Sequence, residues 1–324
     1  QYRELHKKNT DCWKVNCLVN EKIVVTGSSG QLGTRLIPNL LKLGYRVIGI
    51  DINSPKNDLK YIFLEADLTK KESLSCFKDI LNDAKIAIHL AGKINDSQKI
   101  RDFAEESINL DLKGSINLLE CLPNLQQLCY SSSYMVYGPT ITNPINEDHP
   151  TNPSNVYGAC KLLTEKYLNI LSQKLKITLV ILRFMGIYGP GTPLSGRAIP
   201  SFINMIDSNK NPILFGNGLV RKNHVYIDDA IQAIINSITT KKTGIFNIGG
   251  KDAPNNKELI FYINQIFGKD LSIKYVENDI IENDFIMDYS LATKEIGFIP
   301  TIEIQKGLKT HILDFKEKHH EHKK

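Results

Sequence analysis

An apolar segment that runs into three evenly spaced glycines constrains the fold of this chain more than any other feature. Residues 22–26 are apolar after the first lysine, and Gly27, Gly30 and Gly33 follow in the spacing G-x-x-G-x-x-G. Gly27 can adopt the positive φ that turns the chain out of a strand, Gly30 lets the backbone approach a diphosphate, and Gly33 lets a helix pack closely on the sheet. A phosphate would then lie at a helix N-terminus. The pattern predicts a strand, a phosphate-binding loop and a helix.

The residues after this loop complete a dinucleotide-binding unit. Residues 36–43 have apolar side chains at helical spacing, and residues 45–51 form a buried-type strand that ends in Asp51. An acid there accepts hydrogen bonds from ribose hydroxyls and repels a 2′-phosphate, and Lys56 is the nearest following cation, so NAD is expected rather than NADP. The alternative is a doubly wound sheet with an unused crevice. The candidate cofactor-binding residues of this unit are Gly27, Ser29, Gly30, Gln31, Leu32, Gly33 and Asp51.

Composition narrows the class of protein. The chain has 324 residues, of which 42% are hydrophobic, and six scattered cysteines without a C-x-x-C pair. The formal charge of +5 lies partly in residues 316–324, and no basic pattern typical of nucleic-acid binding is visible. No apolar stretch reaches the ~18 residues of a membrane span, and residues 1–20 are too polar for a signal peptide. We expect a cytoplasmic protein with free thiols that binds neither nucleic acid nor membrane.

The two ends of the chain are interpreted as peripheral. Because the sequence begins at Gln1 and a polar stretch precedes the first strand, residues 1–20 are expected to be an N-terminal extension, from a processed product or an excised domain. Half of the eight histidines lie near the other end, namely His311, His319, His320 and His322. Such a segment can bind metal adventitiously, but it is interpreted as solvated, and no metal site is expected.

Strands and helices alternate along the chain. In the first half, strands are predicted at residues 61–65, 86–90 and 128–131, and helices at residues 74–81 and 108–122. Later elements are a helix at 156–173, a strand at 177–182, a strand turning into a helix over 225–237, and a strand at 245–248. This βαβα order predicts an α/β fold, a Rossmann-type doubly wound parallel sheet.

A second, smaller domain is predicted from the segments between the later elements. Residues 186–223 and 251–312 are richer in Pro, Asn and Gly and less regular in period. They are assigned to a mostly C-terminal substrate-binding domain, residues 21–185 and 224–250 to the NAD-binding domain, and residues 313–324 to a polar tail. Ligands of such sheets bind beyond the C-terminal ends of the strands, so the substrate is expected between the two domains.

Tyr157 and Lys161 are the candidate reactive pair. They are four residues apart on the long predicted helix, which places the phenol and the ammonium on one face. A nearby cation lowers the pKa of an acid by about 1 to 3 units, so Tyr157 is expected to exchange protons near neutral pH. The serines at 131–133 end a predicted strand, where a hydroxyl can bond a reacting oxygen. Each feature alone is common on protein surfaces, and only their combination is informative.

With further motifs, these residues resemble the short-chain dehydrogenase/reductase family, in its extended branch of nucleotide-sugar epimerases, dehydratases and reductases, over roughly residues 22–309. The motifs are residues 26–33, Asp51, Ala66-Asp67-Leu68, His89-Leu90-Ala91-Gly92, residues 131–133, Tyr157 with Lys161, Tyr188-Gly189-Pro190 and Phe246-Asn247-Ile248-Gly249. The resemblance implies that Ser133, Tyr157 and Lys161 are catalytic, with Tyr157 as the acid/base. It also implies that Asp67 and Leu68 contact adenine and that Leu90, Ala91, Gly92, Tyr157 and Lys161 belong to the NAD site.

A later stretch, residues 215–229, resembles the family segment whose basic residue binds the nucleotide diphosphate. That position is Lys222 here, where the family more often has Arg, and Arg221 beside it could substitute. Gly186 stands where the epimerases usually have Asn. The candidate substrate-binding residues are therefore Ser133, Tyr157, Gly186, Arg221 and Lys222. Asp228 and Asp229 are interpreted as N-caps of the following helix.

Departures from the family pattern narrow the reaction. Tyr134 and Met135 replace the Asp-Glu pair that the dehydratases carry, so sugar 4,6-dehydration is not expected. An Arg-Pro-Gly-Asp-like element that clamps a diphosphate is missing between Tyr275 and Asp288. Asp111 stands where the family commonly has Asn, in the helix before Gly114.

The leading hypothesis is an NAD-dependent nucleotide-sugar 4-epimerase acting on a nucleotide-diphosphate sugar, in which hydride leaves C4 and later returns to the opposite face. The alternative is an NAD(P)-dependent reductase or dehydrogenase of a 4-keto sugar or other alcohol on the same residues. A regulator that senses the dinucleotide is a rival of another class, against which the intact Ser133, Tyr157 and Lys161 argue. The resemblance also suggests a homodimer, packed through the helices at 108–122 and 156–173, whose remaining apolar faces would form a four-helix bundle.

Overall fold

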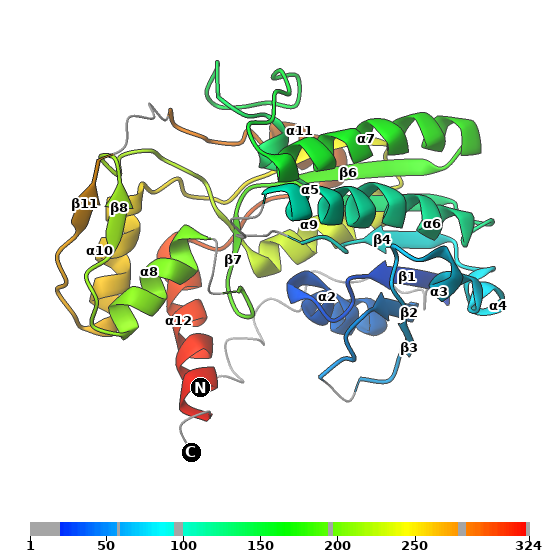
Figure 1. Cartoon of the computed structure of the whole chain (residues 1–324), viewed down its shortest axis with the longest axis horizontal. Helices are drawn as coiled ribbons and strands as arrows, with labels where there is room; N and C mark the ends of the chain where they lie inside the picture. The colour runs from blue at the N-terminus through cyan, green and yellow to red at the C-terminus, as the bar shows by residue number, and fades with distance from the viewer. Residues whose placement is uncertain (1–19, 57–58, 94–99, 194–196, 278–282, 322–324) are drawn as a thin grey trace.

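The computed structural model describes residues 20–56, 59–93, 100–193, 197–277 and 283–321 (Figure 1). These residues form a large α/β body with a smaller lobe at one end of it. Apart from Asn20, the predicted N-terminal extension lies outside the described residues, together with Cys12, Cys17 and His322.

The central sheet consists of seven parallel strands in the order β10-β6-β5-β4-β1-β2-β3. The strands are β1 Lys22–Thr26, β2 Arg46–Asp51, β3 Ile62–Glu65, β4 Ile86–His89, β5 Gln127–Ser133, β6 Thr178–Phe184 and β10 Gly244–Ile248. The chain winds outward in one direction from β1 and in the other from β4, so the order reverses between these two strands. The predicted Rossmann-type doubly wound parallel sheet is confirmed.

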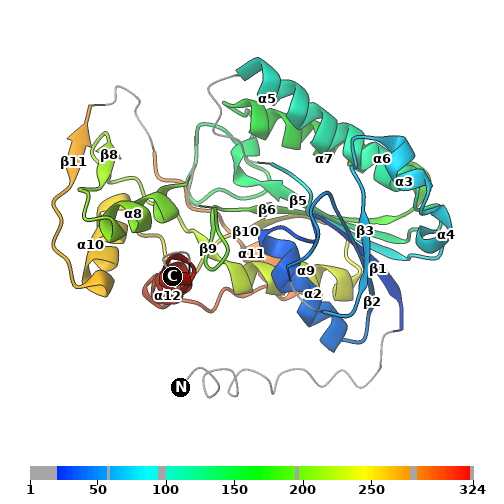
Figure 2. The ribbon, with the colours of Figure 1, turned by 60° about the horizontal axis from the view of Figure 1, so that its bottom comes forward.

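Helices cover both faces of the sheet (Figure 2). Those on one face are α2 Gln31–Lys42, α9 Ile227–Thr240 and α11 Ser290–Ile296, and those on the other include α6 Gly114–Glu120 and α7 Val156–Leu175. Neighbouring residues of a strand point into different layers, so Val25 packs in the first core and Val24 in the second. Burial on both faces explains why these strands read as continuous apolar runs.

Two predicted helices are interrupted. The one at 74–81 is divided into α3 (Lys71–Ser75) and α4 (Lys78–Leu81). The one at 108–122 begins as a π-helical turn, η1 (Ile108–Lys113), which continues α5 (Ile100–Ser107) and leads into α6. Apolar spacing does not reveal a π turn, because the turn is a local insertion within an otherwise helical pattern.

The smaller lobe has its own apolar core. It is formed by α8 Ala198–Asp207, β8 Ile213–Phe215, α10 Asn256–Phe267, β11 Lys274–Val276 and α12 Ile304–Glu321. β8 pairs with β11 in parallel, and Ile203, Leu259 and Leu308 are among the buried residues. Between the lobes, β7 (Ile187–Tyr188), labelled in Figure 1, pairs with β9 (Val225–Tyr226), labelled in Figure 2.

In two places the packing of the helices does not follow the predicted division into domains. α11 falls within 251–312, yet its Ala292 and Ile296 join the core of the large sheet. The predicted polar tail begins inside α12, which runs to Glu321 and buries Phe315, and His311 is buried rather than solvated. Both errors come from judging segments by their polarity, whereas one apolar face is enough to anchor a helix.

The described residues include four free cysteines, Cys76, Cys121, Cys129 and Cys160. Among these same residues, no cluster of three or more His, Cys, Asp or Glu side chains is arranged to hold a metal ion. Nor does the described part contain a helix long and apolar enough to cross a bilayer.

Candidate active site

The loop between β1 and α2 has the shape of a phosphate cradle. Gly27 has a φ of +67°, which favours glycine. A Cβ on Gly33 would lie 2.3 Å from the carbonyl oxygen of Gly27, so only glycine lets α2 start this close to the strand. The N-cap of α2 is Gly30, and the first turn carries no acidic residue. The free N–H groups and the helix dipole therefore suit a diphosphate.

Asp51 lies at the end of β2, beside this loop. Its Oδ2 accepts a hydrogen bond from Ser29 N at 3.0 Å, and its Oδ1 accepts one from Asn53 N at 3.0 Å. These bonds hold the carboxylate at the C-terminal edge of the sheet. A carboxylate in this place suits ribose hydroxyls and disfavours an additional phosphate.

Other predicted cofactor residues lie at the ends of β4 and β3. Ala91, between Leu90 and Gly92, donates from its N to Thr26 Oγ1 at 3.3 Å, next to the loop. Asp67 accepts from the N and Oγ1 of Thr69 at 2.9 and 2.7 Å. The side chain of Leu68 is buried in the sheet core, so it is not available to a ligand.

Two more predicted cofactor residues, in the first turn of α2, contact later parts of the chain. Gln31 donates from Nε2 to Thr192 Oγ1 at 2.6 Å, while its Oε1 accepts from Arg197. Leu32 packs between the core of the sheet and the core of the smaller lobe. The start of α2 is thus the place where the phosphate loop meets the smaller lobe.

Ser133, Tyr157 and Lys161 come together at the C-terminal end of β5. Ser133 is the last residue of that strand, and the other two belong to the first turns of α7. A Cβ on Gly158 would lie 2.3 Å from Met135 O, so the glycine allows α7 to approach the turn that follows Ser133. Tyr157 is thereby placed close to Ser133, whose side chain lowers the pKa of the phenol.

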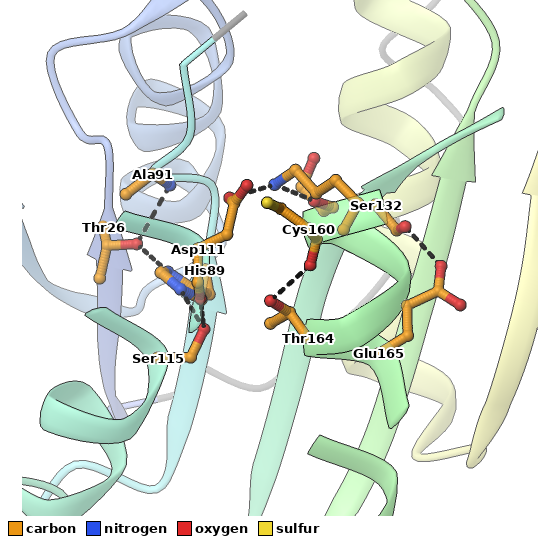
Figure 3. Close-up of polar contacts among 11 residues, drawn as sticks. Thr26, His89, Ala91, Asp111, Ser115, Ser132, Cys160, Thr164 and Glu165 are labelled. Atoms are coloured by element: carbon orange, nitrogen blue, oxygen red, sulfur yellow. Dashed lines mark hydrogen bonds and ion pairs between the residues drawn. The ribbon is translucent and has the colours of Figure 1, made fainter. Parts of the chain in front are cut away.

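Lys161 is buried and held from three sides. Its Nζ donates to Ser131 O at 3.0 Å and forms an ion pair with Asp111 Oδ1 at 3.0 Å (Figure 3). The same nitrogen lies 4.8 Å from the ring centroid of Tyr130 and 5.7 Å from that of Tyr157. The lysine and aspartate side chains are only 4% and 2% exposed, which makes this pair an internal part of the site.

The structure does not support the expectation that Lys161 brings the pKa of Tyr157 down toward neutral pH. Burial raises the pKa of Tyr157 above its usual value, and Lys161 lowers it, but Asp111 raises it again and the net shift is upward. The i, i+4 spacing of Tyr157 and Lys161 indicates only that a cation lies near the phenol. Desolvation and the opposing charge arise from the tertiary fold.

A chain of hydrogen bonds links the phosphate loop to η1 (Figure 3). Thr26 Oγ1 lies 2.6 Å from His89 Nδ1, and His89 Nε2 lies 2.9 Å from Ser115 Oγ. Ser115 Oγ donates to Asp111 O, so it must accept from Nε2–H, which leaves Nδ1 to accept from Thr26. Burial lowers the pKa of His89 to about 3, which keeps the ring neutral. This series of hydrogen bonds fixes the position of the Asp111 backbone.

A second buried network supports the strand end from the other side. Glu165 on α7 binds the Nε and Nη2 atoms of Arg183 at 3.1 and 2.7 Å and also accepts from Ser132 Oγ. Arg183 Nη1 donates to Tyr137 Oη at 2.9 Å. This network was not predicted from the sequence, although an arginine inside an apolar strand indicates that a buried acid lies nearby.

The predicted substrate-binding residues of the later segments are less closely gathered. Arg221 is exposed, and its Nε donates to Ala253 O at 2.9 Å, while Lys222 is half-buried. A Cβ on Gly186 would lie 2.7 Å from His224 Nδ1, so the imidazole fills the space that a side chain at 186 would need. Burial lowers the pKa of His224 to about 4, and this ring too stays neutral.

Asp228 and Asp229 are not the N-caps that the sequence suggested. α9 begins after Tyr226 without a side-chain cap, and both acids lie in its first turn. Asp229 accepts hydrogen bonds from the N and Oγ1 of Thr301 at 3.1 and 2.9 Å and from Ile302 N at 3.1 Å. The carboxylate therefore anchors the segment that leads into α12.

Arg197, at the start of α8, was not anticipated. Its Nη1 donates to Gln31 Oε1 at 3.1 Å and to Ile187 O at 3.2 Å. Within the described part of the chain it forms no ion pair, and its charge acts on Tyr157. A half-buried guanidinium between the phosphate loop and the phenol suits an anionic group of a ligand.

The doubly wound sheet, the phosphate loop and the Ser/Tyr/Lys cluster define a dinucleotide-binding protein of the short-chain dehydrogenase/reductase class. The sequence profile of the NAD dependent epimerase/dehydratase family matches residues 23–249, and the chain belongs to this family. It is thus an enzyme of an NAD-dependent family, and the resemblance seen in the sequence is confirmed.

The relatives of this chain differ from one another in activity. A dTDP-4-dehydro-6-deoxyglucose reductase of Escherichia coli is 29% identical over 309 residues, which cover 88% of this chain and 95% of the relative. A UDP-glucose 4-epimerase of Mycolicibacterium smegmatis is 25% identical over 253 residues, covering 74% and 80%. The crystal structure of UDP-glucuronic acid 4-epimerase from Bacillus cereus, in complex with UDP-glucuronic acid and NAD, matches with a TM-score of 0.81 and 26% identity, covering 92% and 99%.

Proposed function

We propose that this enzyme is a nucleotide-sugar 4-epimerase. The observation that carries the proposal is the cluster of Ser133, Tyr157 and Lys161 at the sheet edge that also carries the phosphate loop. Support comes from the epimerases among its relatives and structural neighbours. The cradle around Gly27 and Gly33 and the carboxylate of Asp51 fit NAD, as the family requires.

Each residue of the cluster has a distinct task. Bound NAD supplies one piece of chemistry, the acceptance and return of a hydride. Tyr157, as phenolate, takes the proton of the sugar hydroxyl at C4 when that carbon gives up its hydride, and gives the proton back when the hydride returns. Ser133 hydrogen-bonds the reacting oxygen and orients it. Lys161 holds the ribose of the cofactor and, through its charge, favours the phenolate.

The nucleotide diphosphate requires cations outside this cluster. We assign it to Lys222 and Arg221 in the segment before β9, with Arg197 available to an anionic group that lies nearer to Tyr157. In this proposal Gly186 and His224, which lie against each other, border the sugar site, and the neutral imidazole can accept a hydrogen bond from a hydroxyl. The smaller lobe, in this proposal, is the substrate-binding domain.

A reductase that converts a 4-keto sugar to an alcohol, with NADH or NADPH consumed, is the second candidate. The specific observation in its favour is the upward shift in the pKa of Tyr157, because a phenol that keeps its proton at neutral pH is suited to protonate a ketone. The Escherichia coli relative with a reductase activity also supports it.

One experiment separates the two candidates. The purified protein is mixed with a catalytic amount of NAD and with UDP-, GDP- and dTDP-hexoses, and the anomeric protons are followed by NMR without any reductant. The epimerase proposal expects a second hexose at constant NAD. An unchanged spectrum, together with oxidation of NADH when 4-keto sugars are supplied, would establish the reductase instead.

We also propose that the enzyme is a homodimer that packs through the helical layer of η1, α6 and α7. Ile108, Leu163 and Ile170 on this layer are 45%, 49% and 57% exposed, which is unusual for large apolar side chains of one layer. Pairing two copies would form a four-helix bundle. Light scattering should give twice the mass of the chain, and a monomeric mass would refute the proposal.

A further inference from the structure

Asp111 is a buried acid that the proposed chemistry does not use. Its side chain is 2% exposed, and its Oδ1 lies 3.0 Å from Lys161 Nζ. A Cβ on Gly92 would come within 3.1 Å of that nitrogen and 3.6 Å of the carboxylate oxygen, so the pair lies against the segment that follows β4, which is proposed to be part of the NAD site. A carboxylate in this place is a second charge beside the reacting phenol.

The local structure holds Asp111 in place. The residue lies within the π-helical turn η1, and π turns inside helices are frequent at functional sites. Its carbonyl oxygen accepts from Ser115 Oγ, which is bonded through His89 to Thr26 (Figure 3). The carboxylate is therefore aimed at Lys161 by the same network that supports the phosphate loop.

We propose that Asp111 is a positioning residue, a built-in counter-ion that fixes the ammonium of Lys161 and cancels part of the electric field that this lysine exerts on the Tyr157 hydroxyl. The proposal rests on the role that the proposed function gives to Tyr157. Its consequence is that the lysine alone does not ionise the phenol at neutral pH, and an additional positive charge in the crevice is needed to do so.

The charged and titratable groups around the pair are few. Tyr130 of β5 and Tyr157 of α7 face Lys161 along with Asp111, and Cys160 lies on the same helix turn. Lys161 and Arg197 act on Tyr157 in one direction and Asp111 acts in the other. His89 stays neutral. Asp111 is thus the one carboxylic acid among the described groups that act on Lys161 or Tyr157.

The test is the ionisation of Tyr157 in the protein without substrate. The chain is labelled with ¹³Cζ-tyrosine, and the signal of Tyr157 is assigned by its loss in Tyr157→Phe. In the wild type it should titrate above the usual ~10. In Asp111→Asn, which keeps the shape and removes the charge, the midpoint should fall by about one pH unit or more.

A matched control removes the same charge from the surface. Glu106 lies on the adjoining helix α5 and pairs with Lys93 at 3.1 Å, with both side chains 55% exposed. Glu106→Gln should leave the titration of Tyr157 where it is in the wild type, because solvent screens this carboxylate. A downward shift of equal size in Glu106→Gln would show a general charge effect and overturn the proposal.

The remaining outcomes are also decisive. An unmoved midpoint in a folded Asp111→Asn protein would mean that the acid only fills space, which contradicts the proposal. Should that variant fail to fold, the wild-type titration decides, and a midpoint below the usual value refutes the counter-ion role. Because no sugar is present, this readout stands even if the protein proves inactive on every nucleotide sugar, whereas failure of the proposed function would show only in the turnover assay.

If turnover is found, it supplies a second readout. The limb of the pH profile of kcat/KM that reports the base should move to lower pH in Asp111→Asn and stay in place in Glu106→Gln.

Discussion

The proposed cofactor site and the proposed substrate site, the cofactor side and the substrate side, are built in different ways. The cofactor side is mostly backbone, namely the turn at Gly27 and the close contact at Gly33, with the carboxylate of Asp51 at the end of β2. The candidate residues of the substrate side are side chains from separate segments, such as Arg197 and Lys222. The cofactor side can therefore stay the same while the substrate side varies, which is how one fold serves several sugars.

The largest effect on activity is expected at Tyr157, which is assigned to both the cofactor side and the substrate side. Tyr157→Phe removes the acid/base and should lower kcat by about 10²- to 10⁴-fold. NAD affinity, measured by calorimetry, should change little, because the aromatic ring remains and only the hydroxyl is lost. The control Tyr275→Phe, at a residue 52% exposed on β11, should keep full activity. Undiminished biological function of Tyr157→Phe would instead favour a dinucleotide-sensing regulator.

The strand ends that carry both proposed sites are supported by the buried ion pair of Glu165 and Arg183. Glu165→Gln leaves Arg183 without its counter-charge at a site where both side chains are at most 3% exposed. The free energy of unfolding should fall by about 3–5 kcal/mol in urea titrations. Glu303→Gln, which breaks the exposed pair with Lys251, should leave the free energy of unfolding nearly unchanged, because solvent screens this pair. Equal losses in the two variants would contradict the account of this network.

Gly33→Ala tests the claim that the cofactor side is backbone geometry. The new methyl group would meet the carbonyl oxygens of Gly27 and Ser28 at 2.3 and 2.6 Å, so α2 must move away from the strand. This overpacking should lower the free energy of unfolding by about 1–3 kcal/mol, and calorimetry should show weaker NAD binding because the displaced loop no longer fits the diphosphate. Normal NAD affinity would mean that the loop does not hold the diphosphate.

Lys222→Ala should act on the other side only. Removing a cation from the proposed diphosphate site should raise KM for the nucleotide sugar by about tenfold, while the affinity for NAD stays constant. Lys210→Ala, at an exposed position after α8, provides the control and should change neither value. A loss of NAD affinity in Lys222→Ala would contradict this assignment, because it would mean that the lysine contributes to the cofactor site.

The same contrast explains what the sequence could predict. The parallel sheet and its phosphate loop follow from local rules, since apolar runs and glycine spacing are written in adjacent residues. The position of Asp111 was noticed, but its effect on Tyr157 depends on a π turn and on burial, neither of which has a local signature. Arg197 and His224 escaped notice because their neighbours, Gln31 and Gly186, are far away along the chain.

The most direct test of the central claim is an epimerisation assay in D₂O with catalytic NAD and the nucleotide sugars, read by proton NMR at C4. Internal return of the hydride predicts a second hexose that keeps its C4 proton, constant NAD, and no reaction in Tyr157→Phe. Two results would contradict the proposal that this enzyme is a 4-epimerase. One is a product that carries deuterium on its ring carbons. The other is a sugar that remains unchanged although the wild-type protein binds NAD.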